Sequence, residues 1–550
     1  IYFLLHIWKM PHKLHVFAPQ LSLPKLPVPE LQETMDKYLT LIKTVVSPQE
    51  YARTKSLVAE QQSMDNWAND WWLHDMYLNV RLPLVINSNP AAVFPCQNFP
   101  SRRHQIRFAA KFLCGMLDFK FLLDSRTLPV ERCKHKEKGQ PLCMEQHYRL
   151  FSSYREPARG SDIQRTDLGT LGTDYIVVAC NNQFYKVDVQ KAGEYISEAD
   201  LSVQISRVLV MAEEREKAPE VGILTSQSRD VWADTRERLM QGHALISVQA
   251  DIHRNRHVNT NLHILENCLF LLCLDKPTVP SRQGFHGGLT NDMTARTHHL
   301  IHGQGAMNNS CNRWMDKTIQ VIISEDGTFG LNMEHSVAEG IALGHMIEYA
   351  LGNMGKDKDT GMTHEPGSLP YPAYLRWNLS SQSLADIRTA KDDVDRMVED
   401  FDLTVFRFAI YGRDFIKQLG MSPDAYIQLA LQLTYYKIHG TLTSTYESAS
   451  VRRFRQGRVD VIRANSPAAL TWVRAMLGQT ESTEDDKYRL LMEAVQWQQD
   501  YTLDTVLGHG IDLHLLGLRE AATELGIPTP ELFTDPSYKE LNTFRLSTSQ

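Results

Sequence analysis

The chain has 550 residues, of which 43% are hydrophobic, 22% charged and 9% aromatic. These values are typical of folded globular proteins and exclude a disordered, collagen-like or coiled-coil chain, while the length predicts two to four domains at roughly 100–200 residues each. The formal net charge of −7 at pH 7 provides no overall positive field to hold nucleic acid or an anionic membrane, so we expect no nucleic-acid partner.

The cysteines and the apolar runs indicate a cytoplasmic protein. The eight cysteines form no CxxC pair, and several lie within apolar runs, as free thiols do in a reducing compartment. The longest apolar run, 268–274, has the length of a strand, so we expect no membrane insertion. Residues 1–9 precede the first methionine, Met10, and have no basic start. We therefore interpret them as a fragment edge or translated upstream sequence rather than a signal peptide.

Helix and strand patterns alternate along the chain, which predicts an α/β fold. Runs rich in β-branched and apolar residues predict central strands at 175–180, 264–274, 318–324 and 328–333. The stretch 353–372 is rich in charge, glycine and proline, which predicts a connection between units. We place a domain boundary just after it.

The second half begins a clear helix at Ser422-Pro423-Asp424. A capping serine, a proline at the first helical position and an acid in the first turn predict a helix from there to about His439. The polar stretch 478–487 predicts a surface loop between helices. No repeat of 20–50 residues is visible, which excludes solenoids and propellers.

Histidines suggest two kinds of site. His298, His299 and His302 include a pair four residues apart that would hold a metal on a helix, but no third ligand completes the set, so we expect structural histidines and no metal. His335 follows a predicted strand and precedes Glu339 by four residues. This spacing suits a general base held near a carboxylate, although a surface ion pair is the alternative.

Two polar segments near the end of the chain are ambiguous by themselves. The basic cluster suits an anionic ligand such as a phosphorylated cofactor, or it forms a solvated helix face; it comprises Arg452, Arg453, Arg455, Arg458 and Arg463. The final segment 547–550 is rich in hydroxyl groups that suit an oxyanion or form a polar terminus.

Taken together, seven motifs in order resemble the choline/carnitine acyltransferase family, and the resemblance covers residues 22–550. They lie at 23–31, 66–78, 312–317, 334–340, 422–425, 445–450 and 546–550. The fold that the resemblance implies has two α/β domains related to chloramphenicol acetyltransferase, with the active site in a tunnel between them. The first domain would span 59–377, and the second 20–58 plus 378–550.

The resemblance also implies roles for individual residues in a CoA-dependent O-acyltransferase. His335 would be the catalytic base that activates a hydroxyl against the thioester of acetyl-CoA, Glu339 would orient its imidazole, and Ser549 would hydrogen-bond the oxyanion. Acetyl-CoA would be a co-substrate, with no permanently bound cofactor. Its expected contacts are Arg413, Lys417, Asp424, Ser448 and Gln550.

The acceptor can be judged from the same resemblance. Carnitine carries a carboxylate, which enzymes of the family bind with a Thr-Asp/Glu-Thr segment and an arginine. At the two threonine positions this chain has Val459 and Val461, and at the arginine position it has Leu513. An unpaired buried carboxylate is costly, so we expect choline as the acceptor and acetylcholine as the product. A quaternary ammonium is held by aromatic faces; the matching positions are Trp72, Tyr77 and Tyr446.

The resemblance leaves some alternatives open. The chain stops directly after its last motif, so we expect the C-terminal part of the second domain to be missing. A carnitine or other short-chain acyltransferase is one alternative function, and a non-catalytic, truncated relative is another. The presence of His335, Glu339 and Ser549 argues against the second. We expect a monomer.

Overall fold

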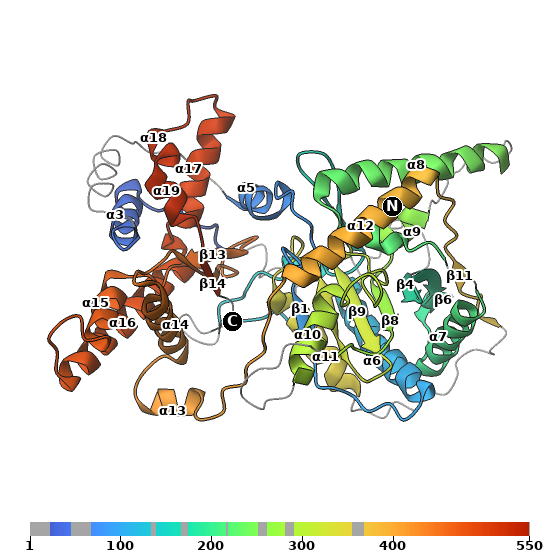
Figure 1. Ribbon diagram of the computed structural model, residues 1–550, viewed down its shortest axis with the longest axis horizontal. Coiled ribbons are helices and arrows are strands. Elements are labelled where there is room, and N and C mark those ends of the chain that lie inside the picture. The colour runs from blue at the N-terminus through green and yellow to red at the C-terminus, as the bar shows by residue number, and fades with distance from the viewer. Residues whose placement is uncertain are drawn as a thin grey trace, which may run out of the picture. The chain divides into compact units, whose positions relative to one another are not determined.

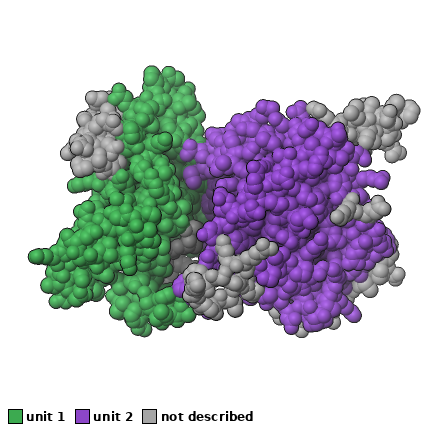
Figure 2. Space-filling model, in the orientation of Figure 1, with its two compact units in different colours: residues 1–73, 130–144, 408–550 green, residues 74–129, 145–407 purple. Residues whose placement is uncertain are grey.

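The computed structural model describes residues 23–45, 68–133, 139–166, 174–215, 218–250, 261–280, 291–354 and 368–548 (Figure 1). The chain divides into two compact units (Figure 2). Unit 1 comprises residues 1–73, 130–144 and 408–550, and unit 2 comprises 74–129 and 145–407. None of the described helices is long and apolar enough to cross a membrane.

Unit 2 is built on a seven-stranded mixed sheet in the order β1-β10-β9-β8-β4-β5-β11. The strands β4, β8 and β9 are parallel, and the outer pairs are antiparallel. The seven strands are β1 (Ala91–Val93), β4 (Tyr175–Cys180), β5 (Gln183–Asp188), β8 (Leu271–Asp275), β9 (Ile319–Ser324), β10 (Phe329–Met333) and β11 (Ala373–Tyr374). Every residue of β8, β9 and β10 is buried, which explains their nearly continuous apolar sequences.

Helices and smaller elements complete unit 2. They are η1 (His74–Leu78), α6 (Arg102–Asp124), η2 (Glu145–Arg149), β2 (Ser153–Glu156), β3 (Ile163–Thr166), β6 (Gln190–Lys191), β7 (Glu194–Tyr195), α7 (Glu198–Glu213), η3 (Val221–Ser226), α8 (Arg229–Ala250), α9 (Asn261–Asn267), α10 (Asn291–His302), α11 (Gly340–Met354) and α12 (Ser381–Asp400). Helix α6 packs against α7 and α11. The close approach of α6 to α11 depends on Gly115, where a Cβ atom would lie 2.8 Å from the Cα atom of Ala350.

Unit 1 combines a three-stranded sheet, in the order β13-β12-β14, with two groups of helices. The strands are β12 (Thr445–Ser450), β13 (Val459–Ile462) and β14 (Leu546–Thr548). The helices are α3 (Leu31–Ile42), α5 (Asn69–Leu73), α13 (Arg413–Gln418), α14 (Pro423–His439), α15 (Pro467–Met476), α16 (Glu484–Asp504), η5 (Thr505–His509), α17 (Asp512–Glu524), α18 (Glu531–Thr534) and α19 (Pro536–Leu541).

The structure confirms most of the predicted elements. Helix α14 begins at Pro423, and the Ser422 hydroxyl caps it by accepting a hydrogen bond from the Ala425 amide. The prediction of a strand from 264 to 274 is wrong in its first part. Residues 264–267 belong to helix α9, and the strand begins only at Leu271. The polar pair Glu266-Asn267 ends the helix before the apolar run that starts at Cys268.

Candidate active site

The loop that carries His335 is fixed at both ends in unit 2. It leaves β10 at Glu334, whose backbone N–H donates to the Thr318 carbonyl at 3.1 Å. The Glu334 carboxylate is buried and accepts hydrogen bonds from the backbone N–H and the hydroxyl of Ser336 at 3.1 and 2.7 Å. The loop enters α11 after Glu339, whose N–H donates to the Gln146 side chain at 2.8 Å.

The structure brings His335 together with two other predicted residues. Its imidazole Nε2 lies 3.6 Å from the Glu339 carboxylate, and its Nδ1 contacts the hydroxyl of Tyr77 on η1. The two rings are 5.3 Å apart between centroids. The His335 side chain is 23% exposed. An imidazole that is partly accessible, with one nitrogen at a hydroxyl and the other near a carboxylate, is a group suited to proton transfer.

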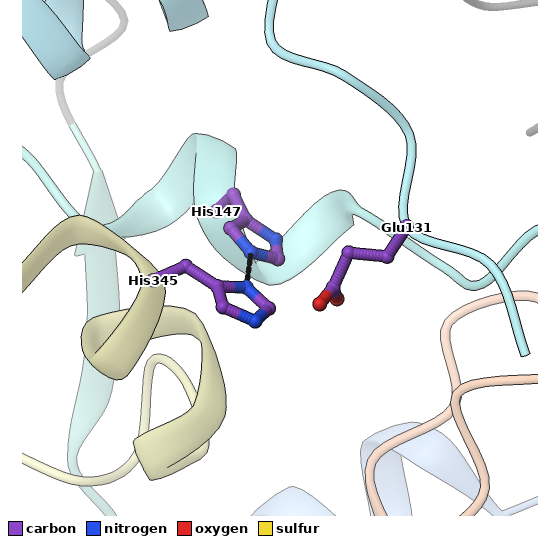
Figure 3. Close-up of side chains that lie close together, drawn as sticks. All are labelled: Glu131, His147 and His345. Carbon is purple, nitrogen blue, oxygen red and sulfur yellow. Dashed lines mark hydrogen bonds between the residues drawn. The ribbon is translucent and has the colours of Figure 1, made fainter. Parts of the chain in front are cut away.

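Other histidines of unit 2 have structural partners. His298 and His302 on α10 bond each other, with Nδ1 and Nε2 2.9 Å apart. The rings of His147 on η2 and His345 on α11 stack, with Nε2 and Nδ1 3.1 Å apart (Figure 3). Figure 3 also draws Glu131, which belongs to unit 1 and pairs there with Arg452.

Unit 1 carries the residues expected to contact CoA. Arg413 and Lys417 lie one turn apart on α13, both exposed, and Arg413 is 3.3 Å from Asp414. Asp424 lies in the first turn of α14, which packs against α13. Ser448 on β12 is paired in register with Val461 on β13.

Two acids of unit 1 have strongly perturbed environments. Burial, and secondly the charge of Asp424, raises the pKa of Glu447 to about 8. Burial also raises the pKa of Asp424, which is hydrogen-bonded to Glu447. Burial, and secondly Asp512, raises the pKa of Asp460 to about 7, even though Asp460 accepts backbone hydrogen bonds from Val461 and Leu513.

Three predicted acceptor residues line one pocket of unit 1, with a volume of about 290 Å³. They are Trp72, Val459 and Leu513, each almost fully buried. The other lining residues are Lys25, Leu26, Ala68, Asn69, Val451, Arg455, Gln456, Gly457 and Arg458. The guanidinium of Arg458 lies over the Trp72 ring, 4.9 Å from its centroid.

The charge of this pocket could not be predicted from the motifs. Lys25, Arg455 and Arg458 are cationic, and no acid is found among the described residues that line it. The pocket therefore presents a positive wall beside its apolar one. The basic cluster was the one sequence signal for this positive charge, and it did not indicate which of its arginines line a cavity.

The remaining predicted acceptor residues lie elsewhere. Tyr77 contacts His335 in unit 2. Tyr446 on β12 packs against Phe544, with centroids 5.5 Å apart, and Val461 lies on β13 outside the pocket lining. Ser549 and Gln550 lie outside the described residues.

The basic cluster is neither a single anion site nor a solvated helix face. Arg463 is fully buried, with Nη2 2.5 Å from the Asp512 carboxylate and Nη1 2.7 Å from the Leu541 carbonyl oxygen. Arg452 pairs with Glu131 and donates to the Cys143 carbonyl at 3.1 Å. These two arginines are internal parts of unit 1, because partners distant in the sequence neutralise them.

Comparison with known proteins identifies the family. The sequence matches the model of the choline/carnitine O-acyltransferases over residues 26–550. It is 39% identical over 569 residues to choline O-acetyltransferase of Sus scrofa, covering 98% of this chain and 85% of that protein. The corresponding enzyme of Danio rerio is 40% identical over 551 residues, which cover 96% of this chain and 83% of that protein.

A carnitine enzyme is almost as similar. Carnitine O-acetyltransferase of Homo sapiens is 38% identical over 556 residues, covering 97% of this chain and 84% of that protein. The chain therefore belongs to the choline/carnitine O-acyltransferase family, which confirms the resemblance. The protein is an acyltransferase.

Proposed function

We propose that the protein is a choline O-acetyltransferase, which transfers the acetyl group of acetyl-CoA to the hydroxyl of choline. The observation that carries the proposal is the environment of His335, held between the Tyr77 hydroxyl and the Glu339 carboxylate. The relatives named choline O-acetyltransferase support this acceptor.

In the proposed reaction His335 removes the hydroxyl proton of choline while the oxygen attacks the thioester carbonyl carbon. The tetrahedral oxyanion receives a hydrogen bond from Ser549. Its collapse breaks the C–S bond, and the imidazolium returns the proton to the CoA thiolate, giving acetylcholine and CoA. Glu339 stabilises the transient imidazolium by its negative charge.

The same proposal assigns the CoA contacts to unit 1. Arg413 and Lys417 offer two cations one turn apart on α13, which suits a phosphate group. Asp424, Ser448 and Gln550 are the further proposed contacts. The domain bounds expected from the resemblance, 59–377 and 20–58 plus 378–550, and a cytoplasmic, monomeric protein belong to this proposal as well.

The pocket of unit 1 supports a second candidate acceptor. Val459 and Leu513 present apolar side chains where a carnitine enzyme is expected to have hydroxyl and cationic groups, which favours choline. However, Lys25, Arg455 and Arg458 also line the pocket, and such cations favour an acceptor with a carboxylate, as carnitine has.

The decisive experiment measures CoA release from acetyl-CoA with choline and carnitine side by side. Choline-dependent release, lowered about 10²–10⁴-fold by His335→Ala, is the expected result. A clear preference for carnitine would replace the first candidate by the second. Release with neither acceptor would contradict both.

A charge-neutralising variant separates the two candidates further. Arg455→Gln removes an exposed cation from the pocket lining. If choline occupies the pocket, its KM should fall because a repulsive charge is lost, whereas if carnitine does, its KM should rise. Arg474→Gln removes a basic residue on α15, outside the pocket lining, and is the matched control.

A further inference from the structure

We propose that Arg155 is a positioning residue that fixes the His335 imidazole by holding both of its neighbours in place. Arg155 lies on β2 and is completely buried. Its Nη2 donates a hydrogen bond to the carbonyl oxygen of Tyr77, whose hydroxyl contacts His335 Nδ1. Its Nη1 lies 3.7 Å from the carboxylate of Glu334, the residue before His335.

The geometry makes one guanidinium a brace between two chain segments that are distant in the sequence. Tyr77 reaches His335 from η1, and Glu334 fixes the start of the loop after β10 through its bonds to Ser336. The planar guanidinium reaches both groups at once, by a hydrogen bond to the Tyr77 carbonyl and by an ion pair at 3.7 Å with the Glu334 carboxylate. Movement of Arg155 would therefore displace the imidazole from both sides.

Arg155 is itself held rigidly by buried charges. Its Nε donates to the Asp162 carboxylate at 2.7 Å, and its backbone N–H donates to the Asp316 carbonyl oxygen at 3.0 Å. Arg229 also binds Asp162, at 2.6 Å, and continues to the Asp316 carboxylate at 2.7 Å. Buried ion pairs of this kind resist rearrangement, because breaking a pair leaves a buried charge uncompensated.

The network also supplies a matched control. Arg229 is as deeply buried as Arg155 and shares Asp162 with it. Its hydrogen bonds go to Asp162, Asp316 and the Arg155 carbonyl oxygen. Arg229→Lys therefore disturbs the network without removing a direct bond to Tyr77 or Glu334.

The experiment compares Arg155→Lys with Arg229→Lys. We expect both variants to melt at lower temperature. Arg155→Lys should lower kcat by about 10–100-fold, with the KM for the acceptor changed less than about threefold, and Arg229→Lys should lower kcat much less. Equal loss of kcat in the two variants, or unchanged kcat in Arg155→Lys, would overturn the proposal. If Arg155→Lys fails to fold, Glu334→Gln tests the same brace with the same expected split.

Because this inference rests on the proposed role of His335, it also needs a measurement that does not depend on catalytic turnover. The ¹⁵N chemical shifts of the His335 ring should move clearly more in Arg155→Lys than in Arg229→Lys, because only the first variant removes direct contacts to Tyr77 and Glu334. Unmoved shifts in Arg155→Lys would refute the brace even in an active enzyme. An inactive wild-type protein would contradict the proposed function without touching this result.

Discussion

Replacement of Glu447 by glutamine should make the protein more stable at alkaline pH. Glu447 on β12 is only 4% exposed, and its carboxyl accepts a hydrogen bond from Gln498 at 3.1 Å. Burial raises its pKa from 4.5 to about 8, and Asp424 adds to the rise. Between these two pH values the folded state keeps a proton that the unfolded state has lost. The stability that this group contributes therefore falls as pH rises through the window.

The magnitude follows from the size of the pKa rise. At about 1.4 kcal/mol for each pKa unit, the rise from 4.5 to about 8 sets an upper limit of about 5 kcal/mol. Asp424 is hydrogen-bonded to Glu447, and its own pKa is raised too. Because the two groups titrate together, we expect the loss of unfolding free energy due to Glu447 alone to be about 2 kcal/mol. Glu447→Gln keeps the side-chain shape but never ionises, so it abolishes this penalty.

The assay is thermal unfolding of wild type and variant from pH 5 to pH 9. We expect similar melting temperatures at pH 5 and a variant that melts several degrees higher at pH 8.5, at about 2–4 °C per kcal/mol. Glu481→Gln, at an exposed loop position, should give no such divergence. Asp460 titrates in the same direction in both proteins and cancels in the difference. Parallel curves for wild type and Glu447→Gln would refute the reasoning.

Two further variants test packing and charge within the units. Gly115→Val should lower the unfolding free energy of unit 2 by about 1–3 kcal/mol or more in urea unfolding, because its Cβ would lie 2.8 Å from the backbone of Ala350. The control Gly344→Ala, where a Cβ meets nothing within 4 Å, should be neutral or stabilising. An equal loss of unfolding free energy in the two variants would contradict the packing argument. Asp512→Ala should cost about 3–5 kcal/mol by the same assay, because it leaves the buried guanidinium of Arg463 without its carboxylate. A loss below about 1 kcal/mol would show that water reaches Arg463.

Local rules predicted the elements whose signals are local. The start of α14 was predictable because a capping hydroxyl, a proline and an acid act within one turn. The strand β9 was predictable because a strand covered on both faces is mostly apolar, and four of its six residues are isoleucine or valine. The end of α9 was mistaken for a strand because a helix of seven residues is too short to show its period, and its Ile264-Leu265 pair lies just before the apolar strand.

The support of the candidate site could not be predicted in this way. Arg155 lies in the short strand β2 and belongs to no motif. Its proposed role depends on contacts with Tyr77 and Glu334, which are 78 residues before it and 179 residues after it in the sequence. No spacing rule connects such positions. The motif around His335 suggested the proposed base, whereas only the fold shows which residues surround it.

The pocket of unit 1 shows how a motif argument about specificity is incomplete. The expectation of choline rested on Val459, Val461 and Leu513, which replace the expected hydroxyl groups and arginine, and so considers three positions only. The charge that a ligand meets is the sum over all lining groups, and Lys25 comes from a segment more than 400 residues before Arg455 and Arg458. In the proposed acceptor pocket, Arg455→Gln therefore lowers the summed positive charge that would separate a cationic from a zwitterionic acceptor, which the motif comparison at Leu513 did not include.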